Sequence, residues 1–145
     1  MNFFERVIRA LTETHPIHPM LVHFPIALTG AAAFFILLAI WRRNKALEQI
    51  AFANIVLAAF GTIAAGVTGM MSNANTYDSA APNATLKMIL ASLLFLITAA
   101  TSLARWHNPD LFETHAKPIY AAAYFISFSL ALTLAFLGGI ILYGF

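Results

Sequence analysis

The sequence contains no cysteine in 145 residues. A disulfide framework, a thiolate zinc site, an iron–sulfur cluster held by cysteine and a cysteine nucleophile are therefore excluded. Charge is also scarce, because only 10% of the residues are charged, whereas soluble domains average about a quarter. A soluble domain of this size would lack the polar groups needed to cover its surface.

Features of nucleic-acid-binding proteins and of enzymes are missing as well. The formal net charge is only +2, and the basic residues form no stripe among aromatic side chains, so we expect no nucleic-acid partner. The sequence has no P-loop, no HExxH motif and no paired carboxylates within an apolar segment. These patterns favour a non-catalytic protein without deciding the question.

What the sequence does contain is apolar residues, at 61% of the chain and a mean hydropathy of +0.80. A hydrocarbon core of about 30 Å requires roughly 20 apolar residues in a helix, and backbone groups in lipid must be satisfied within the segment. Four segments meet this requirement, at about residues 20–41, 47–71, 86–104 and 118–142. The sequence therefore predicts an all-α integral membrane four-helix bundle, forming one domain over residues 1–145.

The N-terminal residues have a different pattern. Apolar side chains recur at spacings of three and four, at Phe3, Phe4, Val7, Ile8 and Leu11, with polar residues opposite. This periodicity predicts a short amphipathic helix, at about residues 3–13, that lies in the membrane interface.

Four spans place both termini and the second linker on one side, here called the near side, and the first and third linkers on the far side. Five basic residues belong to the far side and three to the near side; the far-side group is Arg42, Arg43, Lys45, Arg105 and Lys117. The positive-inside rule then predicts an inner-membrane protein of a bacterium with both termini in the periplasm. We expect Trp41, Trp106 and Tyr120 in the far-side interface, and the acidic residues at membrane edges or in linkers.

Small and polar residues within the spans suggest how the helices pack. Gly61, Ala65 and Gly69 are spaced by four, which allows a neighbouring helix, most simply one of the same bundle, to approach closely. We expect Asn54 to face the interior and bond to a neighbouring helix. Lys87 is expected to extend to water or to pair with Asp78.

The stretch "HPIHPMLVHFPI", residues 15–26, places His15, His18 and His23 among three prolines at the start of the first span. Pro25 cannot donate a hydrogen bond to the Leu21 carbonyl, so one interpretation is that an imidazole N–H satisfies this carbonyl and that the histidines only cap and stitch the helix start. The alternative is a cofactor site, because the other near-side residues include four methionines: Met20, Met70, Met71 and Met88.

Two cofactors fit such a set. Heme b would use imidazole and thioether ligands from His23, His18, His15, Met88 and Met70. Copper, the less favoured choice, would use His18, His23, Met20 and Met71. His18 and His23 are five residues apart, about 140° around a helix, so both cannot ligate the same iron. On the far side, His107, His115, Asp110 and Glu113 suggest a solvated loop, with a zinc site as the alternative.

"HPIHPMLVHFPIAL" at the first span, "GVTG" in the second and "GGIILYG" at the C-terminus resemble the bacterial membrane family called domain of unknown function 2231. The resemblance implies a four-span helical module. Because members also occur joined to cytochrome c or Rieske-type domains, it further implies a place near membrane electron transfer. The family pattern has a histidine near the start of the third span, where this chain has Lys87 and Met88.

Two functions remain open from the sequence. The first is a small non-catalytic membrane subunit that contacts lipid and either other subunits or a second copy of itself, within a membrane redox complex. The second is an electron-transfer protein that carries heme b or copper in the near-side histidine and methionine cluster.

Overall fold

The computed structural model describes residues 2–9 and 17–143, and the regular structure in these two ranges is helical throughout. It comprises one short helix, four long helices and one turn of 3₁₀ helix, which are α1 (Phe3–Arg9), α2 (Ile17–Arg42), α3 (Lys45–Thr76), α4 (Ala84–His107), η2 (Leu111–Glu113) and α5 (Lys117–Tyr143). Each of the four predicted spans lies inside one of the long helices. All four are long and apolar enough to cross a membrane, which confirms the predicted all-α membrane bundle.

The predicted interfacial helix corresponds to α1, which covers residues 3–9. Its remaining part, residues 10–13, lies outside the described ranges. Phe3 and Phe4 are largely exposed, so α1 presents apolar side chains to its surroundings rather than burying them in the bundle.

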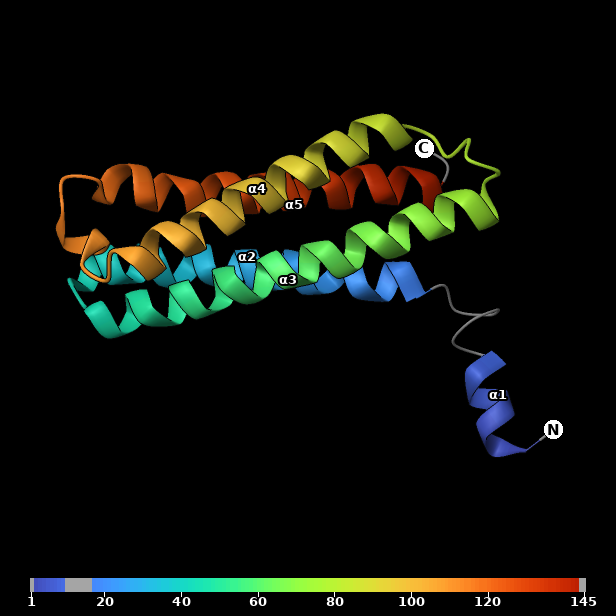
Figure 1. The fold of residues 1–145 in the computed structure, drawn as a ribbon, viewed down its shortest axis with the longest axis horizontal. Helices are drawn as coiled ribbons and strands as arrows, with labels where there is room; N and C mark the ends of the chain where they lie inside the picture. Colours follow the sequence, from blue (N-terminus) through green and yellow to red (C-terminus); the bar gives the residue numbers. More distant parts are fainter. Residues whose placement is uncertain (1, 10–16, 144–145) are drawn as a thin grey trace.

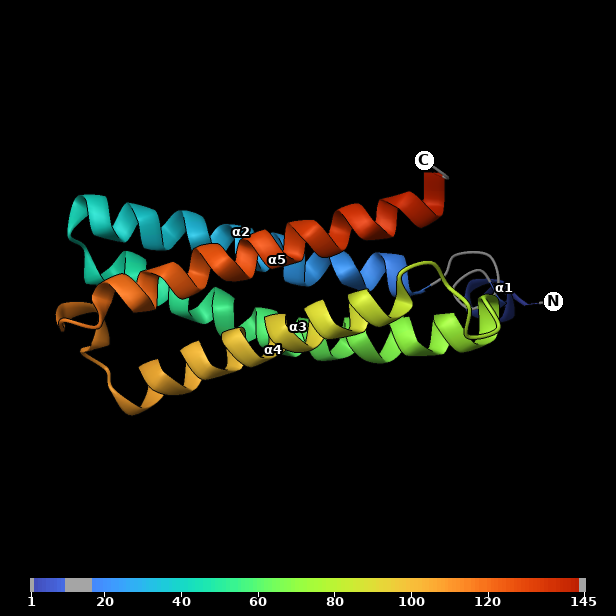
Figure 2. The same cartoon turned by 90° about the horizontal axis from the view of Figure 1, so that it is seen from above.

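The four long helices run antiparallel to their neighbours (Figures 1 and 2). α3 packs against α2 and α4, and α5 completes the ring by packing against α4 and α2. Consequently, α2 and α4 face each other diagonally across the bundle. The near side is the end at which α2 begins and α5 ends, drawn at the right of Figure 1.

The turn between α2 and α3 is short, and local chemistry explains both helix ends. Arg43 adopts the left-handed conformation with φ of 49°, and the Asn44 N–H donates to the Ala39 carbonyl at 3.1 Å. This is the pattern of a Schellman helix end. The Asn44 side chain then accepts a hydrogen bond from the Ala46 N–H at 2.8 Å and caps α3.

The core occupies the far side and the middle of the bundle. Four of the nine residues in its main cluster are alanines, and η2 inserts Phe112 into it from the linker between α4 and α5. The buried cluster is Ala32, Ile36, Ala39, Ala51, Ile55, Phe112, Tyr120, Ala121 and Tyr124. The alanines allow close helix approach. In α4 every buried residue lies between Leu94 and the far end, and in α5 every buried residue whose side chain is described lies between the far end and Ala131.

Candidate functional site

The most unusual group in the bundle is a buried ion pair between α3 and α4. Glu48 is 0% exposed and Arg105 is 7% exposed. The Arg105 Nε donates to Glu48 Oε1 at 2.6 Å, and an Arg105 terminal nitrogen donates to Glu48 Oε2 at 3.0 Å. Such two-pronged pairing is the strongest arrangement available to a guanidinium and a carboxylate.

Two tyrosines of α5 complete this group, which we call the buried charge cluster: Glu48, Arg105, Tyr120 and Tyr124. The Tyr120 hydroxyl donates to Glu48 Oε1 at 2.7 Å, and the two tyrosine hydroxyls are hydrogen-bonded to each other. Because the single hydroxyl hydrogen of Tyr120 goes to the carboxylate, Tyr124 is the donor to Tyr120. The cluster thus links α3, α4 and α5 at the far side.

Within the described residues, no buried side-chain nitrogen or oxygen lacks a hydrogen-bond partner. Buried hydroxyls outside the cluster, including those of Thr29, Thr62, Thr98 and Ser127, donate to carbonyls of their own helices. A fully satisfied polar interior stabilises one arrangement of helices. The buried charge cluster therefore stabilises the packing of α3, α4 and α5 against one another.

The sequence did not predict this cluster. Glu48 lies in the first turn of α3, near the edge of the span as expected for the acidic residues, but its side chain is buried inside the bundle. The expectation of an interfacial Tyr120 is wrong, because Tyr120 is also buried. Trp41 and Trp106 are exposed, as a place in an interfacial belt requires. Asn54 does not bond to another helix; its side-chain amide donates to the Ile50 carbonyl of its own helix at 2.9 Å.

His18 packs between α2 and α3. Its Nδ1 lies 3.2 Å from the Thr68 hydroxyl oxygen, and that hydroxyl donates to the Ala64 carbonyl at 2.9 Å. The hydroxyl therefore accepts from His18, which places the proton on Nδ1. The ring lies against Gly69, where a Cβ atom would stand 2.9 Å from the ring Cε1.

His23 has a different environment. It is exposed, and its Nδ1 donates to the Pro19 carbonyl at 2.6 Å. We expected an imidazole to bond the Leu21 carbonyl. The carbonyl that His23 bonds is instead that of Pro19. In the neutral ring this bond leaves the lone pair on Nε2, the arrangement usual for a metal-ligating histidine.

The other predicted ligands differ from His18 in their surroundings. Met20, Met70, Met71 and Met88 are all exposed, and His15 lies outside the described residues. His18 faces α3 whereas His23 is exposed, as their separation of about 140° requires. Residues 2–9 and 17–143 bring together no group of three or more histidine or acidic side chains that could hold a metal ion.

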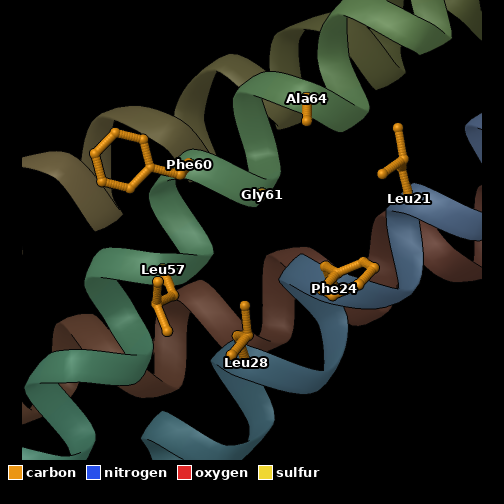
Figure 3. A pocket seen from close by; sticks show the side chains of 7 residues that line it. All are labelled: Leu21, Phe24, Leu28, Leu57, Phe60, Gly61 and Ala64. Atoms are coloured by element: carbon orange, nitrogen blue, oxygen red, sulfur yellow. The ribbon is translucent and has the colours of Figure 1, made fainter.

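The predicted small-residue stripe of α3 packs on α2. A Cβ atom at Gly61 would lie 3.3 Å from Pro25 Cδ, and Gly69 contacts His18 in the same way. Beside this contact, an apolar groove of about 420 Å³ opens between the two helices, lined by Leu21, Phe24, Leu28, Leu57, Phe60, Gly61 and Ala64 (Figure 3). The groove offers hydrocarbon contacts and no polar group.

On the far side, the linker before α5 is held to α3 by charge. Lys45 Nζ lies 2.7 Å from Asp110 and 3.7 Å from Glu113. The hydrogen bond and charge of Lys45 hold the pKa of the exposed Asp110 carboxyl below its usual value. His107 donates from Nδ1 to the Leu103 carbonyl at 2.9 Å, so the described geometry does not assemble the zinc site considered above.

Comparison with known proteins gives one match. No curated protein and no solved structure matches the chain. The model of the family described as "Predicted membrane protein (DUF2231)" matches residues 14–145, which include the histidine–proline stretch and all four long helices. The chain therefore belongs to the DUF2231 family of predicted membrane proteins.

Proposed function

We propose that this protein is a non-catalytic integral membrane subunit that packs against other membrane proteins of a redox complex. The supporting observation is the uneven packing of α4 and α5. Their far halves contain one buried face, whereas the described side chains of residues 84–93 and 132–140 include none that is buried. A partner protein that packs against the near halves would bury the apolar side chains that the bundle leaves uncovered there.

The surface of the near half of α4 is also concave. A second apolar groove, of about 410 Å³, is lined by Met88, Ile89, Ser92, Leu93 and Leu96. In lipid, helix association depends on close van der Waals packing, and a groove provides the surface for it. The redox part of the proposal comes from the family resemblance, since members occur joined to electron-transfer domains.

The expected location is the inner membrane of a bacterium, with the near side in the periplasm. Arg105 is paired inside the bundle, so the remaining support comes from Arg42, Arg43, Lys45 and Lys117 on the far side. Since the chain has no native cysteine, a single Ser79→Cys variant tests this orientation. It should react with a membrane-impermeant maleimide in intact spheroplasts, and protection there would reverse the assignment.

The subunit proposal is tested by purification from native membranes in a mild detergent. We expect a complex whose other subunits carry a redox cofactor, identified by its absorption spectrum and by mass spectrometry. Leu93→Trp, which fills the groove of α4, should release those subunits. Leu103→Trp, an exposed position in the far half of the same helix, should retain them.

A protein that elutes alone from native membranes would contradict the proposal. So would a complex that survives Leu93→Trp and Leu103→Trp equally, because the near half of α4 would then not be the contact surface.

A second candidate function, a carrier of heme b or copper, is favoured by one observation. His23 is exposed and its Nδ1–H is bound to Pro19, so its Nε2 is oriented for a ligand outside the bundle. The second axial ligand of a heme would be a near-side methionine, Met70 or Met88, which are both exposed, or a group from a partner or a second copy.

This candidate predicts a Soret band in the purified protein, with a shift on addition of dithionite. His23→Ala should abolish the band. His107→Ala is the matched control, because this exposed histidine makes the same bond to its own helix at the other end of the bundle. A colourless, metal-free preparation that retains its partners would exclude the carrier function and leave the subunit proposal intact.

A further inference from the structure

The formal net charge of the chain is carried by its far side. The near side has three basic and three acidic residues, whose charges cancel: Arg6, Arg9, Lys87, Glu5, Glu13 and Asp78. The far side has five basic and three acidic residues, so the net charge of +2 belongs to this end. A surface with an excess of one sign attracts a partner of the other sign.

All three far-side carboxylates already have a basic partner. Glu48 is bound to Arg105 inside the bundle. Asp110 and Glu113 lie 2.7 Å and 3.7 Å from the Lys45 Nζ. The excess positive charge therefore lies with the basic residues outside these two groups.

Three far-side basic residues remain, and two of them are consecutive in the turn between α2 and α3, drawn at the left of Figure 1. Lys117, the third, lies with its Nζ 4.3 Å from the centre of the Phe112 ring. Arg42 and Arg43 are both exposed, and the ion pairs within residues 2–9 and 17–143 include neither of them. The turn thus presents two guanidinium groups whose charge no described carboxylate balances.

Trp41 sets the level of Arg42 in the membrane. It is 74% exposed at the end of the first span, where tryptophan favours the boundary between acyl chains and headgroups. The guanidinium carbon of Arg42 lies 5.0 Å from the centre of the Trp41 ring. This cation–π contact holds the Arg42 charge near the level of the lipid phosphates.

Arg43 occupies a backbone position that does not favour arginine. It follows the end of α2 with φ of 49°, in the Schellman pattern described above. Glycine is the usual residue there, because the Cβ of an L-residue is strained in the left-handed conformation. An interaction that offsets this strain through the charge of Arg43 is therefore expected outside the chain.

We propose that the α2–α3 turn binds the headgroup of an anionic phospholipid, with Arg42 and Arg43 at the phosphate and Trp41 beside the glycerol and the upper acyl chain. Guanidinium groups suit this role, since their planar N–H donors match the geometry of phosphate oxygens. The exposed indole next to the two charges favours a lipid over a soluble anion. This inference does not depend on the proposed function, because a subunit without partners would retain the turn.

The two tryptophans of the chain make the test local. Trp106→Phe leaves Trp41 as the only tryptophan, and Trp41→Phe leaves Trp106, which is also 74% exposed. Trp106 is a matched control, because the arginine before it is bound to Glu48. The purified full chain is reconstituted in phosphatidylcholine, and its fluorescence is quenched with brominated phosphatidylglycerol or brominated phosphatidylcholine. The quenching gives the binding constant of one lipid relative to the other at each tryptophan.

We expect phosphatidylglycerol to be preferred at Trp41, with each arginine contributing a factor of about five, and no preference at Trp106. Arg42→Gln and Arg43→Gln, each combined with Trp106→Phe, should lower the preference by that factor. Lys87→Gln removes a basic residue from the near side and should leave it unchanged. Because the attraction is electrostatic, the preference at Trp41 should also fall as the salt concentration rises.

Arg43→Gly separates lipid binding from the geometry of the helix end. Glycine adopts a positive φ without strain, so this variant should raise the thermal midpoint of unfolding in phosphatidylcholine alone. It should at the same time lose the share of the lipid preference that Arg43 supplies.

Equal quenching of Trp41 by the two lipids would overturn the proposal. An equal preference at Trp41 and Trp106 would also overturn it, because the attraction would then belong to the whole far side. A preference that persists in full in both Arg42→Gln and Arg43→Gln would do the same.

Discussion

Replacing Arg105 with methionine is expected to destabilise the folded protein by about 3–5 kcal/mol, the cost of leaving one member of a buried ion pair without its partner. Methionine preserves much of the side-chain volume, so the loss reflects the charge that remains on Glu48. Glu48 is fully buried and keeps only the Tyr120 hydrogen bond in this variant. Reversible unfolding in mixed micelles of neutral detergent and dodecyl sulfate, followed by circular dichroism, measures the effect.

The double variant Glu48→Gln/Arg105→Met separates charge from packing. Removing both charges should recover a large part of the loss, because no unpaired ion is then buried. Lys45→Met is the control, since the pair of Lys45 with Asp110 is exposed and screened by water and salt, so its loss should have little effect on stability. A single variant at Arg105 that is no more destabilised than Lys45→Met would show that the buried charge cluster does not hold the helices together.

The sequence predicted the four spans because apolar length is a sufficient signal for a helix in lipid. Its errors concern which side of a helix faces inward. In water the inward face is recognised by its apolar residues, but in lipid both faces are apolar, so periodicity says little. Tyr120 was therefore assigned to an interfacial belt, although it is buried beside Glu48.

A different signal could have located the buried charge cluster. Ala51 follows Glu48 by three residues, and Ile55 follows Ala51 by four. All three side chains therefore lie on one face of α3, and all three are buried. A carboxylate on such a stripe requires a cation from another helix. Arg105 is the cation that pairs with Glu48. The positive-inside rule nevertheless counts it with the loop residues, because it lies near the end of a span.

The histidine segment was anticipated in part. The separation of five residues correctly predicted that His18 and His23 lie on different faces of α2. It did not predict which of the two faces packs against α3. His18 fits between α2 and α3 because Gly69 has no side chain, and neither residue alone indicates this contact. Ligation of heme or copper by these histidines and the near-side methionines stays a prediction.

The contact between His18 and Gly69 leads to a second prediction with a large effect. Gly69→Ala should destabilise the protein by about 1–3 kcal/mol, because the added Cβ would stand 2.9 Å from the imidazole Cε1. Gly66→Ala is a matched control three residues away on the same helix. Its methyl group meets open space, so the better helix propensity of alanine should leave stability unchanged or raise it by up to about 1 kcal/mol.

The reason for the difference can be isolated in the His18→Ala background. The ring is gone there, so adding Gly69→Ala should cost nothing further and the two substitutions should be strongly non-additive. The Gly69→Ala, Gly66→Ala, His18→Ala and His18→Ala/Gly69→Ala variants are all measured in the same buffer and detergent. If Gly69→Ala and Gly66→Ala behave alike, the imidazole can rotate away at no cost. The close approach of α2 to α3 would then be set by Pro25 on Gly61 rather than by His18, because that contact joins the same two helices without a flexible ring.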